Sequence, residues 1–171
     1  MKNEITGMKL RLIVMNFLQF AVWGAYLTSM GTYLFNIGLG AKIGLFYAMQ
    51  GIVSLFMPAV MGIIADRWVP AQKLYGFCHF MAAVFMVAAG WYGYVDGEAV
   101  NFGTLFTFYS LSVAFYMPTL ALTNSVAYTA LDKVKLDPVI AFPPIRIFGT
   151  IGFICSMLLT DILGFQNNYM Q

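Results

Sequence analysis

Long apolar runs separated by short charged connections dominate this chain. A helix needs about 20 apolar residues to cross a bilayer. Five runs reach that length, and we expect helices at about residues 12–35, 43–65, 74–95, 102–131 and 138–163. Because the connections are short, neighbouring helices should run antiparallel. The pattern predicts an all-α polytopic membrane protein without a soluble domain.

Composition strengthens this prediction and excludes other classes. Of the 171 residues, 61% are hydrophobic and only 9% are charged, whereas soluble domains carry about 25% charged residues. The net charge is +2 and no basic cluster of the kind that binds nucleic acid is present. Cys78 and Cys155 lie in apolar runs and are expected to pack as small core residues. We therefore expect no disulfide, no metal site and no nucleic-acid partner.

Lysine and arginine positions orient the chain, because cytoplasmic loops are enriched in them. With a cytoplasmic N-terminus, that side would carry nearly all of the loop cations, and the opposite side would carry only Lys42. The first uncharged run, residues 12–41, exceeds the apolar core of a cleaved signal peptide, which is about 7–15 residues. We expect a retained first helix and an N-terminus inside. The cytoplasmic cations would be Lys2, Lys9, Arg11, Arg67, Lys73, Lys133 and Lys135.

A lone arginine, Arg146, interrupts the fifth apolar run. It lies in the segment Phe-Pro-Pro-Ile-Arg-Ile-Phe-Gly-Thr-Ile-Gly-Phe at residues 142–153, and no acidic residue occurs between Asp137 and Asp161. A charge inside such a run costs roughly 3 kcal/mol on insertion scales. A partner group, a water-filled cavity or a ligand must offset that cost.

The depth of Arg146 depends on where its helix begins. Asp137 followed by Pro138 is a typical start, with Asp as N-cap and Pro in the first helical position. Arg146 would then lie about 12 Å along the helix at 1.5 Å per residue. A start at Pro143 would instead leave it in the first turn, where its side chain reaches the headgroup region. The apolar residues 139–142 favour the deeper position.

Three side chains of this helix share one face: Arg146, Thr150 and Phe153. They present a planar cation with five donors, a hydroxyl and an aromatic ring. This set suits a neutral ligand that has several oxygens and a flat ring. Gly149 and Gly152 form an adjacent small face that can pack tightly against a neighbouring helix.

The first helix carries a polar face of its own, formed by Asn16, Gln19, Trp23 and Tyr26 at helical spacing. Amide groups avoid lipid, so this face should point to the protein interior. It either lines a substrate cavity or joins helices by hydrogen bonds. Gln19 and Trp23 are therefore the weaker candidates for substrate contact.

The end of the second helix reads Gly62-Ile-Ile-Ala-Asp66-Arg67, followed by Lys73. Gly-x-x-x-Asp-Arg at this place resembles the loop signature of the major facilitator superfamily, in which the loop latches a cytoplasmic gate. Residues 69–71 depart from that signature, because Val, Pro and Ala replace its glycine and basic residues. The alternative interpretation is an ordinary charged turn.

The resemblance becomes specific in the fifth run. Residues 142–153 resemble the fifth-helix segment of the bacterial nucleoside:proton symporters, a major facilitator family. Three further stretches agree with it: Phe-Leu-Gln-Phe-Ala-Val-Trp-Gly at 17–24, Phe-Met-Pro-Ala at 56–59 and Tyr-Met-Pro-Thr-Leu at 116–120. The resemblance implies two six-helix bundles that work by alternating access in the bacterial inner membrane. This chain would form most of the N-terminal bundle, and Arg146, Thr150 and Phe153 would contact the nucleoside.

Proton coupling needs a titratable group within the membrane. The chain has no carboxylate at mid-depth, and His79, which lacks an acidic neighbour at helical spacing, should be a packed, hydrogen-bonded histidine. The resemblance implies that the proton site lies in a C-terminal half absent from this sequence, a connection to which we expect to begin at residues 167–171. The proton is then the coupling ion, with no other cofactor.

Two alternatives stay open. One is a sugar or other small-solute carrier of the same superfamily. The other is a membrane protein that transports nothing: a helical subunit or an intramembrane enzyme. No cluster of His, Cys and acidic residues favours the enzyme.

Overall fold

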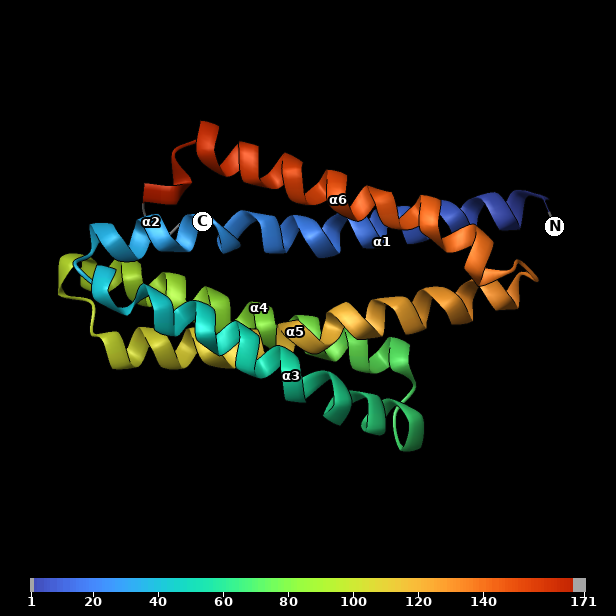
Figure 1. Cartoon of the computed structure of the whole chain (residues 1–171), viewed down its shortest axis with the longest axis horizontal. Helices are drawn as coiled ribbons and strands as arrows, with labels where there is room; N and C mark the ends of the chain where they lie inside the picture. Colours follow the sequence, from blue (N-terminus) through green and yellow to red (C-terminus); the bar gives the residue numbers. More distant parts are fainter. Residues whose placement is uncertain (1, 168–171) are drawn as a thin grey trace. The chain divides into compact units, whose positions relative to one another are not determined.

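A computed structural model gives the fold, and it describes residues 2–167 apart from the side chains of Lys2 and Glu98. Residues 168–171, to which the expected polar connection extends, lie outside the described part. Six α-helices are present in the described residues (Figure 1). They are α1 (Lys2–Leu27), α2 (Ser29–Asn36), α3 (Ile43–Arg67), α4 (Ala71–Asp96), α5 (Phe102–Lys133) and α6 (Pro138–Ile162), with 3₁₀ turns at Gly40–Lys42, Gly97–Ala99 and Phe165–Asn167.

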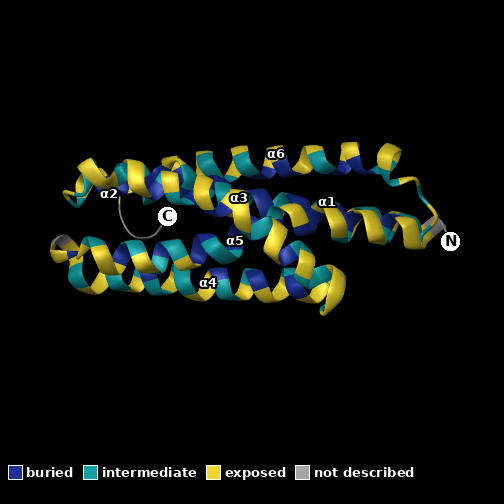
Figure 2. Cartoon of the chain, turned by 60° about the horizontal axis from the view of Figure 1, so that its bottom comes forward, coloured by how far each residue is buried: buried dark blue, intermediate teal, exposed yellow. Residues whose placement is uncertain are grey.

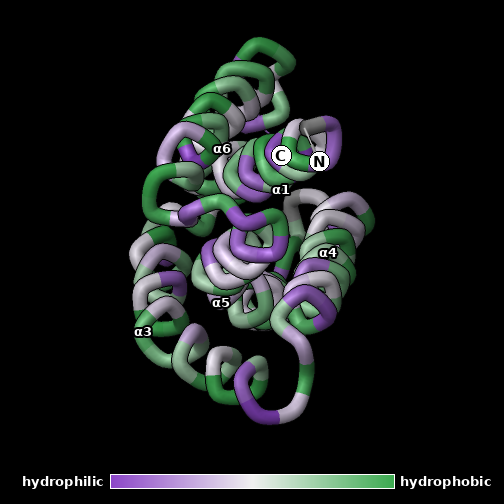
Figure 3. The backbone as a smooth tube through the Cα atoms, turned by 90° about the vertical axis from the view of Figure 1, so that its right-hand side faces the viewer, coloured by the Kyte–Doolittle hydropathy of each residue, from purple (hydrophilic) through white to green (hydrophobic). Residues whose placement is uncertain are grey.

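Five stretches of the described chain are long and apolar enough to cross a membrane. Their hydrophobic character dominates the backbone view in Figure 3. Figure 2 marks many of their residues as exposed, and large apolar side chains such as Leu55, Phe80 and Ile147 are among them. In water this much exposed apolar surface would be unfavourable. The surface is suited to contact with lipid, as the composition predicts.

The first of these stretches differs in detail from the expected helix at 12–35. Helix α1 begins ten residues earlier, at Lys2, and ends at Leu27, while α2 resumes at Ser29. The Ser29 hydroxyl donates a hydrogen bond of 2.5 Å to the carbonyl of Ala25. A serine bonded to the carbonyl four residues back competes with the backbone ladder and bends helices. This explains the interruption at Thr28, which composition alone does not reveal.

The described residues divide into two compact units. The first contains residues 2–30 and 123–166, and the second contains residues 31–122 with Asn167. Helix α5 contributes to both, since the division falls between Leu122 and Thr123. In the first unit, α1 and α6 lie side by side (Figure 1).

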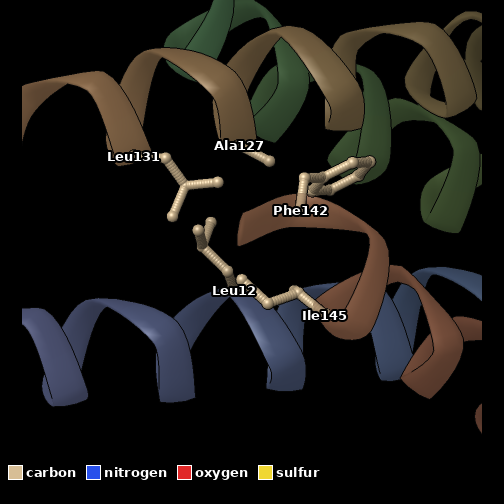
Figure 4. Packing of buried hydrophobic residues seen from close by; sticks show 5 residues of the cluster. All are labelled: Leu12, Ala127, Leu131, Phe142 and Ile145. Carbon is tan, nitrogen blue, oxygen red and sulfur yellow. The ribbon is translucent and has the colours of Figure 1, made fainter. Parts of the chain in front are cut away.

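An apolar cluster holds the first unit together. Its buried side chains come from α1, from the last turns of α5 and from α6, and they point toward one another (Figure 4). Burial of a Leu, Ile or Phe side chain contributes roughly 1.5–3 kcal/mol. The cluster therefore fixes the start of α6 against α1. Its members are Leu12, Ala127, Leu131, Phe142 and Ile145.

The second unit has its own core, built around Met61, Leu74, Cys78 and Leu122. Cys78 is buried there, as expected for a small core residue. The same expectation is wrong for Cys155, which is exposed on α6, because an apolar run does not show which of its residues face lipid. Polar side chains also pair inside this unit. Gln50 of α3 donates a hydrogen bond to the hydroxyl of Tyr109 in α5, so the two helices are joined by a polar contact as well as by apolar packing.

Candidate functional site

The local sequence at the start of α6 determines how deep Arg146 lies. The Asp137 carboxylate accepts a hydrogen bond of 2.9 Å from the backbone N–H of Val139, and Pro138 occupies the first helical position. The predicted N-cap is confirmed, and the helix continues through Pro143 and Pro144 to Ile162. Arg146 therefore lies about 12 Å from the helix start at 1.5 Å per residue. It is not a first-turn residue.

Glycines bring α6 unusually close to α1. A Cβ built at Gly152 would collide with the backbone carbonyl oxygen of Phe17 and lie 2.9 Å from its carbonyl carbon. On the opposite side, a Cβ at Gly24 would meet the backbone of Phe153 and lie 2.5 Å from the hydroxyl of Ser156. Real Cβ atoms do not approach so closely. The expected tight packing of the small face of α6 is confirmed, and its neighbour is the first helix.

This packing places the Arg146 guanidinium on an aromatic ring. Its central carbon, Cζ, lies 3.8 Å from the centroid of the Phe20 ring in α1. An arginine within about 6 Å of a ring centroid is attracted by the negative face of the ring, by about 0.5–2 kcal/mol depending on desolvation. Within the described chain, no hydrogen bond or ion pair engages this guanidinium. The Phe20 ring therefore offsets part of the free-energy cost of placing the Arg146 charge in an apolar helix, for which the sequence alone showed no partner.

Gly149 provides the space for this stack. A Cβ at this position would lie 2.7 Å from Cδ2 of Phe20 and 2.8 Å from Nη1 of Arg146. Both groups could not keep their present positions if the residue were alanine. The glycine one turn beyond Arg146 is thus part of the geometry around the cation and also part of the helix interface.

Further aromatic side chains extend the site along α1 and α6. Trp23 lies with its ring centroid 6.2 Å from that of Phe20 and 6.0 Å from that of Phe153, the latter in an edge-on arrangement. Trp23 and Phe153 are half-buried, and Thr150 is exposed. The structure thus brings the predicted residues Arg146, Phe153 and Trp23 into one aromatic group around Phe20, with Thr150 on the exposed part of the same helix.

The polar face of α1 points inward, as predicted. Asn16 and Gln19 are at most 1% exposed. Asn16 donates a hydrogen bond of 2.9 Å to the carbonyl of Leu12. Gln19 accepts one of 3.3 Å from the hydroxyl of Thr123 in α5. This contact favours the helix-joining interpretation for Gln19 over the cavity-lining one, because the amide is enclosed within the first unit.

The predicted gate residues lie in the second unit, at the junction of α3 and α4. Asp66 and Arg67 end α3 and Lys73 lies in the first turn of α4; all three are exposed. A Cβ at Gly62 would meet no atom of the described chain within 4 Å. The close helix approach expected at Gly62 therefore involves no described element and stays a prediction, as does the gate.

Other reactive side chains are packed rather than assembled into a centre. The ring nitrogen Nδ1 of His79 donates to the carbonyl of Tyr75 at 3.1 Å. The His79 ring lies tilted against the ring of Tyr75 and edge-on to the ring of Tyr116. This agrees with the packed histidine expected from the sequence. The searched residues contain no group of three His, Cys, Asp or Glu able to hold a metal ion.

Phe20 is the residue that sequence reasoning missed. Its position beside Gln19 and three residues before Trp23 was visible, yet a phenylalanine in an apolar helix gives no polar signal. Only the pairing of α1 with α6, set by glycines far apart in the sequence, identifies it as the partner of Arg146.

Five apolar stretches of membrane-spanning length define a polytopic membrane protein, and a half-buried cation lies on an aromatic ring where two of its helices meet. The chain belongs to the nucleoside H⁺ symporter family, whose profile matches residues 6–171. It is 40% identical over 164 residues to xanthosine permease of Escherichia coli (strain K12), covering 95% of this chain and 38% of that protein. It is also 40% identical over 168 residues to nucleoside permease NupG of the same organism, covering 96% and 38%.

Two crystal structures of nucleoside transporter NupG resemble the fold, with TM-scores of 0.86 and 0.85 at 39% identity. Each comparison covers 95% of this chain and 39% of the solved chain. The predicted family and the all-α major facilitator fold are confirmed. The chain spans less than two fifths of the length of these relatives.

Proposed function

We propose that this chain forms part of a transporter that takes up nucleosides together with protons by alternating access. Membership of the nucleoside H⁺ symporter family supports this proposal, as do relatives named as permeases. The observation that carries it at the residue level is the Arg146 guanidinium, which lies on the Phe20 ring within the α1–α6 pair and makes no hydrogen bond or ion pair with a described residue.

In this proposal Arg146 and Thr150 donate hydrogen bonds to the nucleoside, and Phe153 forms a stacking surface or wall for its base. Arginine matches ligands that carry several acceptor oxygens, because its donors are fixed in one plane. Trp23 contacts Phe153 edge-on and would hold that wall in place. Gln19 is proposed as a structural neighbour of the site, since it bonds Thr123.

The test is uptake of radiolabelled uridine by cells that express the full-length transporter or its Arg146→Ala variant. A hydrogen bond to a charged donor contributes about 1.5–3 kcal/mol, so the variant should lose about 12- to 150-fold in uptake efficiency. Surface expression, measured on the same cells, controls for folding. Unchanged uptake at equal expression would rule out the binding role.

A sugar or other small-solute carrier of the same superfamily is the alternative substrate assignment. An excess of unlabelled nucleosides should compete with uridine uptake, whereas an excess of hexoses should not. If only sugars compete, the substrate is a sugar and the nucleoside assignment is wrong. Loss of uptake after collapse of the proton gradient would support symport.

Orientation and gating are also proposed. The excess of lysine and arginine on one side supports a cytoplasmic N-terminus in the bacterial inner membrane. Asp66, Arg67 and Lys73 would then form a cytoplasmic gate with groups outside this sequence. The proton-binding carboxylate is likewise proposed to lie in the remainder of the longer protein, because the apolar runs here contain none at mid-depth.

A further inference from the structure

We infer that Phe20 is a positioning residue of the nucleoside site: its ring holds the Arg146 guanidinium in place and leaves the hydrogen-bond donors open for the ligand. The inference rests on the proposed function, and it assigns a role to a residue of α1 that carries no polar group. Three observations carry it: the contact itself, the burial of the ring and the space left by Gly149.

The contact is close and face-centred. Arg146 Cζ lies 3.8 Å from the Phe20 centroid, which is the separation of van der Waals contact between carbon atoms. The Phe20 ring is only 9% exposed, whereas Arg146 is half-buried. The ring is therefore the fixed partner and the guanidinium is the group that it holds. The α1–α6 glycine interface fixes the ring in turn.

The chemistry of this support differs from that of a salt bridge. A carboxylate partner would accept two N–H groups of the guanidinium and occupy one edge of its fork. An aromatic face attracts the cation through its quadrupole and accepts none of these in-plane donors in the usual geometry. Support by Phe20 therefore stabilises the charge while its five donors remain available. In this arrangement the guanidinium can donate several hydrogen bonds to an uncharged, oxygen-rich ligand.

The stack of Arg146 on Phe20 needs a glycine at position 149. Its missing side chain would occupy the volume between Phe20 Cδ2 and Arg146 Nη1, which lie 2.7 Å and 2.8 Å from the built Cβ. The ring and the guanidinium therefore fill the pocket that the glycine leaves.

The expected gain is one of preorganisation. Ordering a flexible side chain on binding costs about 0.5–1.5 kcal/mol, which corresponds to about 2- to 12-fold in affinity. If the ring orders Arg146 beforehand, removing the ring should weaken nucleoside binding by that factor. The maximal transport rate per transporter should change little, because the ring takes part in holding the ligand-binding group rather than in the movement of the bundles.

The experiment is a double-mutant cycle on the purified full-length transporter, with equilibrium binding of radiolabelled uridine as the readout. Phe20→Leu removes the ring and Phe20→Tyr retains it. Arg146→Ala and the combined Phe20→Leu/Arg146→Ala variant complete the cycle. Only the monodisperse, folded fraction is assayed, so that a lower yield does not count as lower affinity. Phe20→Met, which fills the volume without a ring, replaces Phe20→Leu if the latter gives no folded protein.

Phe142→Leu is the matched control, because Phe142 is a buried ring of α6 that belongs to the apolar cluster and lies edge-on to Tyr128. Among the described residues, the ring that Arg146 stacks on is that of Phe20. It should alter thermal stability and leave the uridine dissociation constant near that of the wild type. Uptake kinetics on the same variants separate KM from maximal rate, and a merely structural role of Phe20 would lower the maximal rate through fewer active transporters.

We expect Phe20→Leu to raise the dissociation constant by about 2- to 12-fold, Phe20→Tyr to restore it, and Phe20→Leu to have no further effect once Arg146 is alanine. Binding by Phe20→Leu equal to wild type, while Arg146→Ala loses affinity, would overturn the role of Phe20 and leave the proposed function intact. Independent, additive losses would overturn it as well. Wild-type binding by Arg146→Ala would remove the proposed binding role of Arg146, and the role of Phe20 with it.

Discussion

Gly152→Ala tests whether the contact between α1 and α6 is as close as the structure describes. The added methyl group would meet the backbone of Phe17, with its carbonyl carbon at 2.9 Å and its Cα at 3.0 Å. Ordinary contacts begin near 3.5 Å. A backbone group cannot rotate away as a side chain can, so the two helices must separate by roughly half an ångström or more to restore contact distances of that size.

The expected cost follows from this geometry. Overpacking of a well-packed interface costs about 1–3 kcal/mol, and alanine regains about 1 kcal/mol of helix propensity over glycine. The net effect on the free energy of unfolding should lie between about zero and 2 kcal/mol of destabilisation. The shift is about 2–4 °C per kcal/mol for 150–250 residues and smaller for a longer protein. The apparent melting temperature of the full-length protein should therefore fall by at most about 8 °C.

The assay is heating of the full-length protein in detergent, followed by size-exclusion chromatography of the fraction that remains folded. Gly76→Ala is the matched control, because a Cβ at Gly76 in α4 would meet nothing within 4 Å. This control should gain stability or stay unchanged. If Gly152→Ala behaves like Gly76→Ala, the close approach of α1 and α6 is wrong, and with it the position of Phe20 beneath Arg146.

Two further predictions concern the other candidate residues. Gln19→Leu removes the acceptor of the Thr123 hydroxyl. We expect the free energy of unfolding to fall by about 1 kcal/mol and the KM for uridine to stay unchanged. A raised KM would instead indicate that Gln19 contacts the substrate. Asp66→Asn removes a negative charge from the C-terminus of α3, where the helix dipole disfavours it by about 0.3–1 kcal/mol. This variant should be slightly more heat-stable and yet slower in uptake; undiminished uptake would leave only the charged-turn interpretation.

Much of the fold could be predicted from the sequence because lipid imposes simple rules. Apolar length identified the spans, and the Asp137–Pro138 pair identified the start of α6, since a capping carboxylate and a first-position proline both act locally. The break between α1 and α2 escaped prediction. It depends on the rotamer of Ser29 and on competition for a single carbonyl, neither of which alters the hydrophobic pattern.

The candidate site was predictable only in part. Arg146, Thr150 and Phe153 follow from spacing on a single helix together with the family resemblance, and Trp23 follows from the polar face of the first helix. Phe20 does not, because its importance arises from a contact between residues 126 positions apart in the sequence. Periodicity shows which face of a helix is buried, but it does not show which neighbour that face meets. The glycines of α6 predicted a closely packed neighbouring helix, but they did not indicate that this helix is α1.

The pairing of Arg146 with Phe20 also bears on the biogenesis of the protein. Translation delivers α1 to the membrane before α6 is made, so the aromatic ring is in place when the arginine leaves the ribosome. Insertion of an arginine at the middle of a span costs about 2.5–3.5 kcal/mol, which is an upper value for Arg146 at about 12 Å from the start of α6. The ring attracts the cation by about 0.5–2 kcal/mol. The earlier helix should therefore favour stable entry of α6 into the bilayer, because its ring offsets part of the cost of the one basic residue in that helix.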